Sequence, residues 1–370
     1  MGSRSKGRWL PSFLIIIMIT LKDFSDILYD FHQKKSGLDT MQKLLDEAKE
    51  CFINNLSDLD PKELAHTSIK GRTPDERKHN LIAKCNTVIN ESERAISKYI
   101  DSSGAEGIED FYSIFFDSNK PLEEANVQEI SPRSFYRMRK TEENKKYEFY
   151  KRKEIFLISK EKEQFISSAR FNDAGQPCLY LASSLYLAWE ECRRPNFNLV
   201  NFSRFQNVKT LKVIRISIVP RMNSIGDFIM GYFTLLCCMK IRDGLQYNFQ
   251  YKVSNMFIKI LTLNILRGGD IDGISFLSSR RFDCEDFLFN LRYNDDVYVF
   301  PPKKPVSTGV CPELAKLFKL TQPKTYFLFK AHRFLFDART AFTSDYNESL
   351  FAMIEKQLNS KHEPLDYYDK

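Results

Sequence analysis

The chain has 370 residues, of which 43% are hydrophobic, 28% charged and 14% aromatic. This length exceeds that of one ordinary compact domain and predicts two, and the composition excludes a disordered or fibrous protein. The formal net charge of +7 is compatible with an anionic ligand or with nucleic acid, but it requires neither.

The first 20 residues are an apolar N-terminal segment of open role. Basic residues precede LPSFLIIIMITL (10–21), as in a secretory signal, but no small-x-small cleavage site follows. The apolar stretch is shorter than the roughly 20 residues that span a bilayer. We expect a cytoplasmic protein without a membrane partner, and a membrane anchor is the alternative.

The eight cysteines and five histidines form no recognisable metal-binding motif. There is no C-x-x-C pair, and the histidines are scattered singly, whereas a structural zinc site needs clustered thiolates or imidazoles. We therefore expect no metal site. Free, mostly buried thiols fit a cytoplasmic location.

Residues 21–125 are expected to form a helical domain. In LLDEAKECFI (44–53) and NLIAKCNTVINESERAISKYI (80–100), apolar residues recur at three- and four-residue spacing with charges between them. The stretches SDLDPKE and KGRTPDE supply turn signals between helices. The pattern predicts a bundle of about four helices that ends near SSGAEG (102–107).

From about residue 130, short β-like runs alternate with helical stretches, which predicts an α+β core over 130–302. A C-terminal extension at 303–370 is partly helical, in NESLFAMIEKQLN (347–359). The expected strands are EIFLIS (154–159), PCLYLA (177–182), LKVIRISIV (211–219), GISFL (273–277) and VYVFP (297–301).

A basic run, RSFYRMRKTEENKKYEFYKRK (133–153), joins the two regions and holds nine Lys/Arg against three Glu. Most such runs are solvated charged segments, and we prefer this interpretation. The interleaved aromatic residues and arginines leave a phosphate-facing, nucleic-acid-binding surface as the alternative.

The stretch RFNDAGQPCLYLASSLYLAWEEC (170–192) combines a turn, a short strand and a helix that Ser183 or Ser184 can cap. At a helical step, Glu191 lies at the margin of the apolar stripe and Glu190 points towards water. An acid at a core margin costs desolvation free energy unless something compensates it. Glu191 is therefore the candidate functional acid.

The order of residues in this stretch is also informative. Arg170 precedes a turn with Gly-x-Pro, a Leu-Tyr-Leu run that contains Tyr180, and a short helix that ends in Glu191. This arrangement resembles the characteristic run of the RES domain, a family named for its Arg, Glu and Ser residues and known from bacterial toxin–antitoxin systems.

Two further segments extend the resemblance. FYRMRK is similar to an upstream Tyr-Arg segment and places the first arginine of the family at Arg137. DGISFLSSR (272–280) is similar to the serine segment and places that serine at Ser278, with Ser279 as the alternative. Together with YNDDVYVFPP, the resemblance covers residues 130–302.

The resemblance implies an ADP-ribosyltransferase-like fold, with a mixed, mainly antiparallel sheet and flanking helices. The helices of residues 21–125 look similar to a HEPN-like region that precedes RES domains in a larger architecture. HEPN ribonucleases carry an Arg-x4–6-His motif, and the pair Arg72 and His79 has an acceptable spacing. Because this pair sits beside a proline turn, we interpret it as coincidence.

The resemblance also implies that NAD⁺ is consumed as a substrate, without a further cofactor. A carboxylate stabilises the oxocarbenium-like cation formed when the nicotinamide–ribose bond breaks, and arginines bind the diphosphate. A tyrosine ring packs against nicotinamide or ribose, and a serine hydroxyl contacts a phosphate or ribose oxygen. The implied catalytic residues are Glu191, Arg170, Tyr180 and Ser278, and the implied NAD⁺-binding residues are Arg137, Arg170, Tyr180, Ser278 and Ser279.

The acceptor stays open between water, phosphate and a protein side chain, so the expected activity is that of a glycohydrolase, a phosphorylase or an ADP-ribosyltransferase. No G-x-G-x-x-G follows a strand, which disfavours a Rossmann dehydrogenase. The family implies a toxin restrained by an antitoxin or another inhibitory protein, and the oligomeric state is open. A nucleic-acid-binding or HEPN-type RNA-cleaving protein is the alternative function, although we do not expect nucleic acid as a partner.

Overall fold

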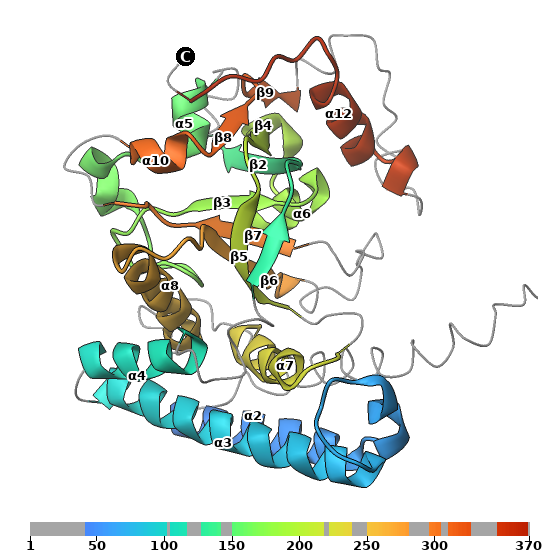
Figure 1. Cartoon of the computed structure of the whole chain (residues 1–370). Coiled ribbons are helices and arrows are strands. Elements are labelled where there is room, and N and C mark those ends of the chain that lie inside the picture. The colour runs from blue at the N-terminus through green and yellow to red at the C-terminus, as the bar shows by residue number, and fades with distance from the viewer. Residues whose placement is uncertain are drawn as a thin grey trace, which may run out of the picture.

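The computed structural model describes residues 41–101, 104–116, 127–141, 150–217, 222–238, 250–280, 296–304, 310–326 and 346–368. Figure 1 shows a layer of long helices beneath a twisted β-sheet, with helices α7 (Ile225–Cys237) and α8 (Gln250–Leu266) between them. This arrangement confirms the α+β class with flanking helices that the sequence predicts.

The helical layer follows from the apolar spacing of its segments. Its members are α2 (Met41–Asp58), the short η1 (Pro61–His66), α3 (Pro74–Asp101) and α4 (Gly104–Phe116). In α2 the buried residues lie on one stripe, from Leu44 to Leu56, and charged residues lie between them. Proline and two acids open α3, as is favourable at a helix N-terminus.

The predicted end of the helical region near 102–107 is wrong, because α4 begins there and continues to Phe116. The reason is a close helix crossing at Gly107. A Cβ atom at this position would lie 2.4 Å from the backbone nitrogen of Tyr99, so the glycine lets α4 pack directly on α3. Glycine here marks a contact between helices and not the start of a linker.

The sheet is mixed and mainly antiparallel, as the sequence predicts. Within the described residues it has nine strands in the order β1-β5-β6-β7-β3-β2-β4-β8, with β9 paired to β4. The β5–β6 pair is parallel and the other pairs are antiparallel. The strands are β1 (Val127–Ile130), β2 (Ser134–Lys140), β3 (Leu179–Ala182), β4 (Val200–Asn207), β5 (Leu211–Ile216), β6 (Gly273–Leu277), β7 (Asp296–Phe300), β8 (Phe318–Leu320) and β9 (Lys324–Thr325).

Four of the five expected strands are present, as β3, β5, β6 and β7. The fifth, EIFLIS (154–159), is wrong, because residues Arg152–Phe156 form helix α5. The Glu154 carboxylate accepts a hydrogen bond from the backbone nitrogen of Lys151 at 2.6 Å, which closes the first helical turn. A four-residue apolar run does not distinguish a buried strand from a buried helical turn.

Two central strands, β2 and β4, were not predicted as strands, because their sequences carry charged or buried polar residues. In β4, the amide of Asn201 donates to Thr141 at 2.9 Å and the hydroxyl of Ser203 donates to the Thr321 carbonyl at 2.8 Å. These hydrogen bonds satisfy the buried polar groups. The first part of the basic run is β2, which lies between β3 and β4, whereas residues 142–149 fall outside the described part.

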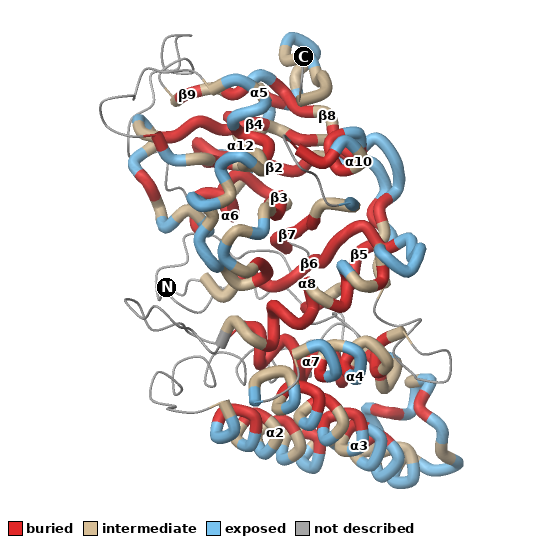
Figure 2. Tube along the Cα trace, turned by 90° about the vertical axis from the view of Figure 1, so that its left-hand side faces the viewer, coloured by how far each residue is buried: buried red, intermediate tan, exposed pale blue. Residues whose placement is uncertain are grey.

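The two faces of the sheet are covered by different helices, and Figure 2 shows the strands between them as mostly buried chain. One face packs against α7 together with α6 (Leu185–Glu191) and α12 (Leu350–Leu358), and its hydrophobic cluster continues into α2, α3 and α4. The opposite face packs against α5 and α10 (Pro312–Ala315). Besides η1, the described residues include the short 3-10 helices η3 (Lys160–Phe165), η4 (Phe197–Leu199) and η6 (Tyr346–Glu348).

The predicted domain boundaries at residues 21, 125, 130 and 302 stay predictions. In the structure, the rings of Phe111 and Phe115 in α4 pack against Phe233 of α7 and Phe257 of α8 at centroid distances of 5.2–5.7 Å. The helical layer therefore shares this aromatic core with α7 and α8, and the hydrophobic cluster continues from these helices to one face of the sheet. Among the described helices, none combines the length and the apolar character needed to cross a bilayer.

Candidate active site

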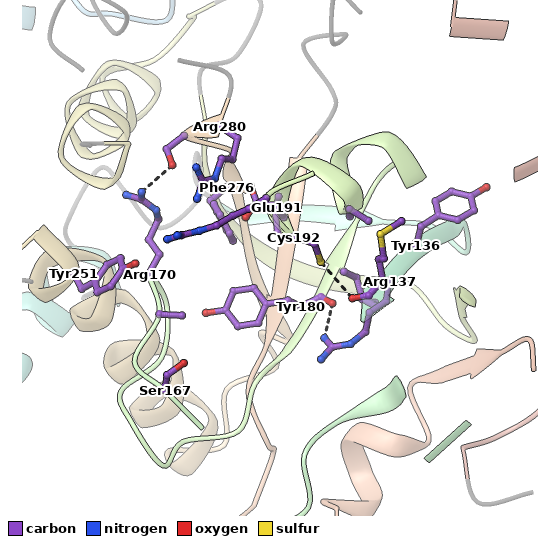
Figure 3. Close-up of a pocket in the computed structure, with 18 residues that line it drawn as sticks. Tyr136, Arg137, Ser167, Arg170, Tyr180, Glu191, Cys192, Tyr251, Phe276 and Arg280 are labelled. Atoms are coloured by element: carbon purple, nitrogen blue, oxygen red, sulfur yellow. Dashed lines mark hydrogen bonds between the residues drawn. The ribbon is translucent and has the colours of Figure 1, made fainter. Parts of the chain in front are cut away.

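A cavity of about 660 Å³ opens on the face of the sheet that carries α6 and α7. This volume is in the range of small-molecule and cofactor sites. Figure 3 shows the side chains around it. Five of the six site residues predicted from sequence line the cavity, namely Arg137, Arg170, Tyr180, Glu191 and Ser279.

The turn after Arg170 fixes the position of Tyr180. The Tyr180 hydroxyl donates to the side-chain oxygen of Asn172 at 2.9 Å and accepts from the backbone nitrogen of Phe171 at 3.2 Å. Burial raises the pKa of this hydroxyl. The phenol is thus an anchored neutral group, and its ring forms part of the cavity wall.

The same turn is tied to helix α8. The carboxylate of Asp173 accepts from the side-chain nitrogen of Asn255 at 2.8 Å and from the ammonium of Lys259 at 2.5 Å. Gly175 adopts φ 79°, a conformation that glycine supplies without strain. The turn residues predicted from sequence therefore hold the strand and the cavity wall to the helices behind them.

Arg170 spans from this turn to the end of helix α7. Its guanidinium donates to the carbonyl of Cys237, in the last turn of that helix, and to the hydroxyl of Ser279 at 2.9 Å. The guanidinium carbon also lies 5.9 Å from the centre of the Tyr251 ring. A cation is favourable at a helix C-terminus, so Arg170 combines a structural role with its place in the cavity wall.

Helix α6 is held at its N-terminus by two side chains. The Ser184 hydroxyl accepts from the backbone nitrogen of Leu187 at 3.2 Å, as an N-cap does. The Glu355 carboxylate of α12 accepts from the backbone nitrogen of Leu185 at 2.5 Å and from the hydroxyl of Tyr346 at 2.6 Å. The C-terminal segment thereby fixes the helix that carries the candidate acid.

The two adjacent glutamates of α6 have different environments. Glu190 is only 1% exposed and pairs with the guanidinium of Arg194 at 2.9 Å. The prediction that Glu190 points to water is therefore wrong. The physical reason is that α6 lies between the sheet and α12, and so it has no solvent-facing side at this position.

Glu191 instead opens onto the cavity. Its carboxylate accepts a hydrogen bond from the Ser278 hydroxyl. The surrounding protein raises the pKa of Glu191 through desolvation, and this effect exceeds the opposing influence of Ser278, Arg170 and Arg280. A carboxylate with a raised pKa in a cavity is a candidate for catalysis.

The two serines differ in position. Ser278 is fully buried, and its hydroxyl also accepts from the backbone nitrogen of Arg280 at 3.2 Å. It is not among the residues that line the cavity, and its hydroxyl contacts Glu191. The expected contact between Ser278 and a phosphate or ribose oxygen stays a prediction. Ser279 does line the cavity, next to Arg170.

Arg137 lies apart from the other arginines, on the far side of Tyr180 from Arg170 (Figure 3). Strands β2 and β3 share a single register pair, Tyr136 with Ala182. Next to this pair, the guanidinium of Arg137 donates a hydrogen bond to the backbone carbonyl of Tyr180 at 2.7 Å. Its Nε is buried without a hydrogen-bond partner in the described residues. Burial lowers the pKa of Arg137 to about 10.

The cavity residues that were not predicted from the sequence include three with charged or aromatic side chains that could contact a ligand, namely Arg193, Tyr251 and Arg280. Arg193 directly follows the predicted motif, and Arg280 directly follows the two serines, so proximity in sequence was the available signal. Tyr251 carries no such signal, because the fold alone brings α8 to the cavity. The described lining residues thus include four arginines and a single acid, Glu191, which favours an anionic ligand.

The pair Arg72 and His79, which has the spacing of the HEPN motif, is not among the residues that line the cavity. Arg72 is exposed in the loop before α3, and His79 is exposed on that helix. Within the described ranges, no group of three or more His, Cys, Asp or Glu side chains is arranged to hold a metal ion.

The chain is similar to a curated protein of Bacillus subtilis (strain 168) named "Putative toxin YopC", with 26% identity over 247 residues. The match covers 57% of this chain and 52% of the relative, so the chain spans about half the length of that protein. No family model matches the chain, and no solved structure matches it significantly. The RES-domain and HEPN-like resemblances stay predictions.

Proposed function

We propose that this protein is an NAD⁺-consuming enzyme that cleaves the nicotinamide–ribose bond and acts as a toxin. One observation carries the proposal: the one carboxylate among the described lining residues, that of Glu191, is held by Ser278 in an arginine-lined cavity of about 660 Å³. The resemblance of residues 130–302 to the RES domain agrees with this arrangement.

The chemistry requires such a carboxylate. When the bond between the ribose carbon and the pyridine nitrogen breaks, the electron pair leaves with nicotinamide, and positive charge develops on the ribose. A carboxylate fixed beside the ribose stabilises that charge. The Ser278 hydrogen bond orients Glu191 for this role, and an acceptor nucleophile then forms the new bond to the ribose carbon.

The arginines suit the diphosphate of the substrate. Arginine offers planar, paired donors that match phosphate oxygens. Arg137 and Arg170 lie on opposite sides of Tyr180, so we propose that they hold different parts of the ligand and do not clamp one group together. A bound anion would compensate the buried charge of Arg137, whose Nε has no partner in the described chain.

The toxin role rests on the name of the Bacillus relative and on the RES resemblance. An enzyme that depletes NAD⁺ must be restrained in the cell that makes it, so we propose an antitoxin or another inhibitory protein as a partner. Binding of that partner over the cavity is the simplest form of restraint.

Product analysis tests the proposed activity. Purified protein is incubated with NAD⁺, with and without inorganic phosphate, and the products are separated by chromatography. We expect nicotinamide in stoichiometric amounts, and the second product then identifies the acceptor as water, phosphate or protein. Intact NAD⁺ after prolonged incubation, in the presence and in the absence of phosphate, would refute the proposal.

A further inference from the structure

Helix α6 is followed, after Cys192, by two successive arginines with left-handed backbone conformations. Arg193 has φ 63° and Arg194 has φ 49°, and these are the two non-glycine residues with positive φ in the described ranges. Residues with a Cβ atom adopt this conformation at a cost, so it persists only where surrounding contacts or a function maintain it.

The conformation of Arg194 is explained by its contacts. Its guanidinium pairs with the buried Glu190 carboxylate at 2.9 and 3.1 Å and lies 5.7 Å from the centre of the Trp189 ring. Its backbone nitrogen donates to the Trp189 carbonyl at 3.0 Å. Arg194 is thus turned inward, against the body of the protein.

Arg193, in contrast, is exposed and lines the cavity. Its backbone nitrogen donates to the Glu190 carbonyl at 2.8 Å, which closes the helix end. Its side chain is exposed and forms part of the cavity wall, as Glu191 does two residues earlier. The last residue of α6 and the left-handed turn after it therefore contribute an acidic and a basic residue, Glu191 and Arg193, to the wall of one cavity.

We propose that Arg193 binds a phosphate of the dinucleotide substrate, next to the ribose on which Glu191 acts. The inference rests on the proposed function and adds a residue that the RES resemblance does not assign. A guanidinium suits this task because it binds two phosphate oxygens at once. The strained backbone is maintained because it brings this group to the cavity.

The two neighbouring arginines provide a matched pair of variants. Arg193→Gly suits a positive φ, so we expect an unchanged or higher Tm together with a KM for NAD⁺ that rises by about 10- to 100-fold, as loss of a charged hydrogen bond predicts. Arg194→Gly leaves the Glu190 carboxylate buried without its partner, so we expect it to lower Tm. An unchanged KM for NAD⁺ in Arg193→Gly would overturn the inference.

Binding of ADP, measured by titration calorimetry, separates this inference from the proposed activity. We expect the wild-type protein to bind ADP and Arg193→Gly to bind it about 10- to 100-fold more weakly. That result supports the phosphate site even if NAD⁺ is not cleaved. Equal ADP affinity in the two proteins, or no binding to the wild type, would overturn it. Arg193→Asn, which also tolerates positive φ, replaces the glycine variant if the latter does not fold.

Discussion

The two faces of the central sheet are built from the same strands, but one face forms a packed core and the other forms a cavity wall. On the face covered by α5 and α10, rings such as Phe135, Phe205 and Phe318 interlock in a tightly packed core. On the opposite face, the strands form one wall of the arginine-lined cavity. Alternation along one strand divides these roles, since Leu179 and Leu181 of β3 enter the core while Tyr180 faces the cavity.

Stability and the proposed activity therefore depend on different side chains, which lie on the two faces of one sheet. Substitutions in the aromatic core should change the free energy of unfolding, whereas substitutions in the cavity should change turnover and leave folding intact. Variants in the core and in the cavity can therefore test whether folding stability and turnover depend on different residues.

Glu191→Gln should have the largest effect on turnover. The substitution retains the size of the side chain but removes the negative charge that stabilises the ribosyl cation. We expect kcat to fall by about 10²- to 10⁴-fold, with no decrease in Tm. Nicotinamide release and a thermal unfolding curve measure the two quantities. A variant that loses Tm in proportion to its activity would show that Glu191 is structural.

Phe205→Ala should have the largest effect on stability. The Phe205 ring is fully buried and stacks on Phe156 at a centroid distance of 5.9 Å. We expect the free energy of unfolding to decrease by about 3–5 kcal/mol, as measured by urea denaturation. The control is Val208→Ala, whose side chain is 43% exposed and should change stability little. Equal effects of the two substitutions would contradict the assignment of this core.

The pH dependence of turnover should follow the raised pKa of Glu191. The ionised form is required, so kcat should be lost as pH falls through the folded-state pKa, which lies above the ordinary value of 4.5. The sign for stability is opposite: because the folded protein holds this proton more tightly than the unfolded chain, Glu191 favours folding less as pH rises through that pKa. A pH–rate profile that is flat down to pH 4.5 would contradict this assignment.

Ser278→Ala should have a smaller effect. The Ser278 hydroxyl lowers the pKa of Glu191 by donating a hydrogen bond, so its loss should move the pH–rate profile to higher pH. We also expect kcat at neutral pH to decrease by about 10-fold, as loss of one hydrogen bond to a charged group predicts. Ser279→Ala is the control, since its hydroxyl meets Arg170 and should leave the profile in place. A shared shift in both variants would argue against this positioning role.

Much of the fold follows from sequence patterns because apolar periodicity reports burial directly. The long helices α2 and α3 and the strands β5, β6 and β7 have such patterns. Strands β2 and β4 do not, because arginines interrupt the apolar pattern and hydrogen-bonded polar residues such as Asn201 occupy buried positions. These partners come from distant parts of the chain, so no local pattern reveals them.

In the candidate site, too, some features follow from the local sequence and others depend on contacts with distant residues. The motif residues Arg170, Tyr180 and Glu191 line one cavity, and their proposed roles stay predictions. The burial of Glu190 could not be predicted, because it depends on how α12 packs against α6 and on the ion pair with Arg194.

The most direct test of the central claim compares nicotinamide release from NAD⁺ by the wild-type protein, Glu191→Gln and Phe205→Ala at one temperature where all three are folded. The account predicts release by the wild type, near-complete loss in Glu191→Gln and retained release in Phe205→Ala. Release by Glu191→Gln at the wild-type rate would contradict it, because the cavity carboxylate would then have no part in the reaction.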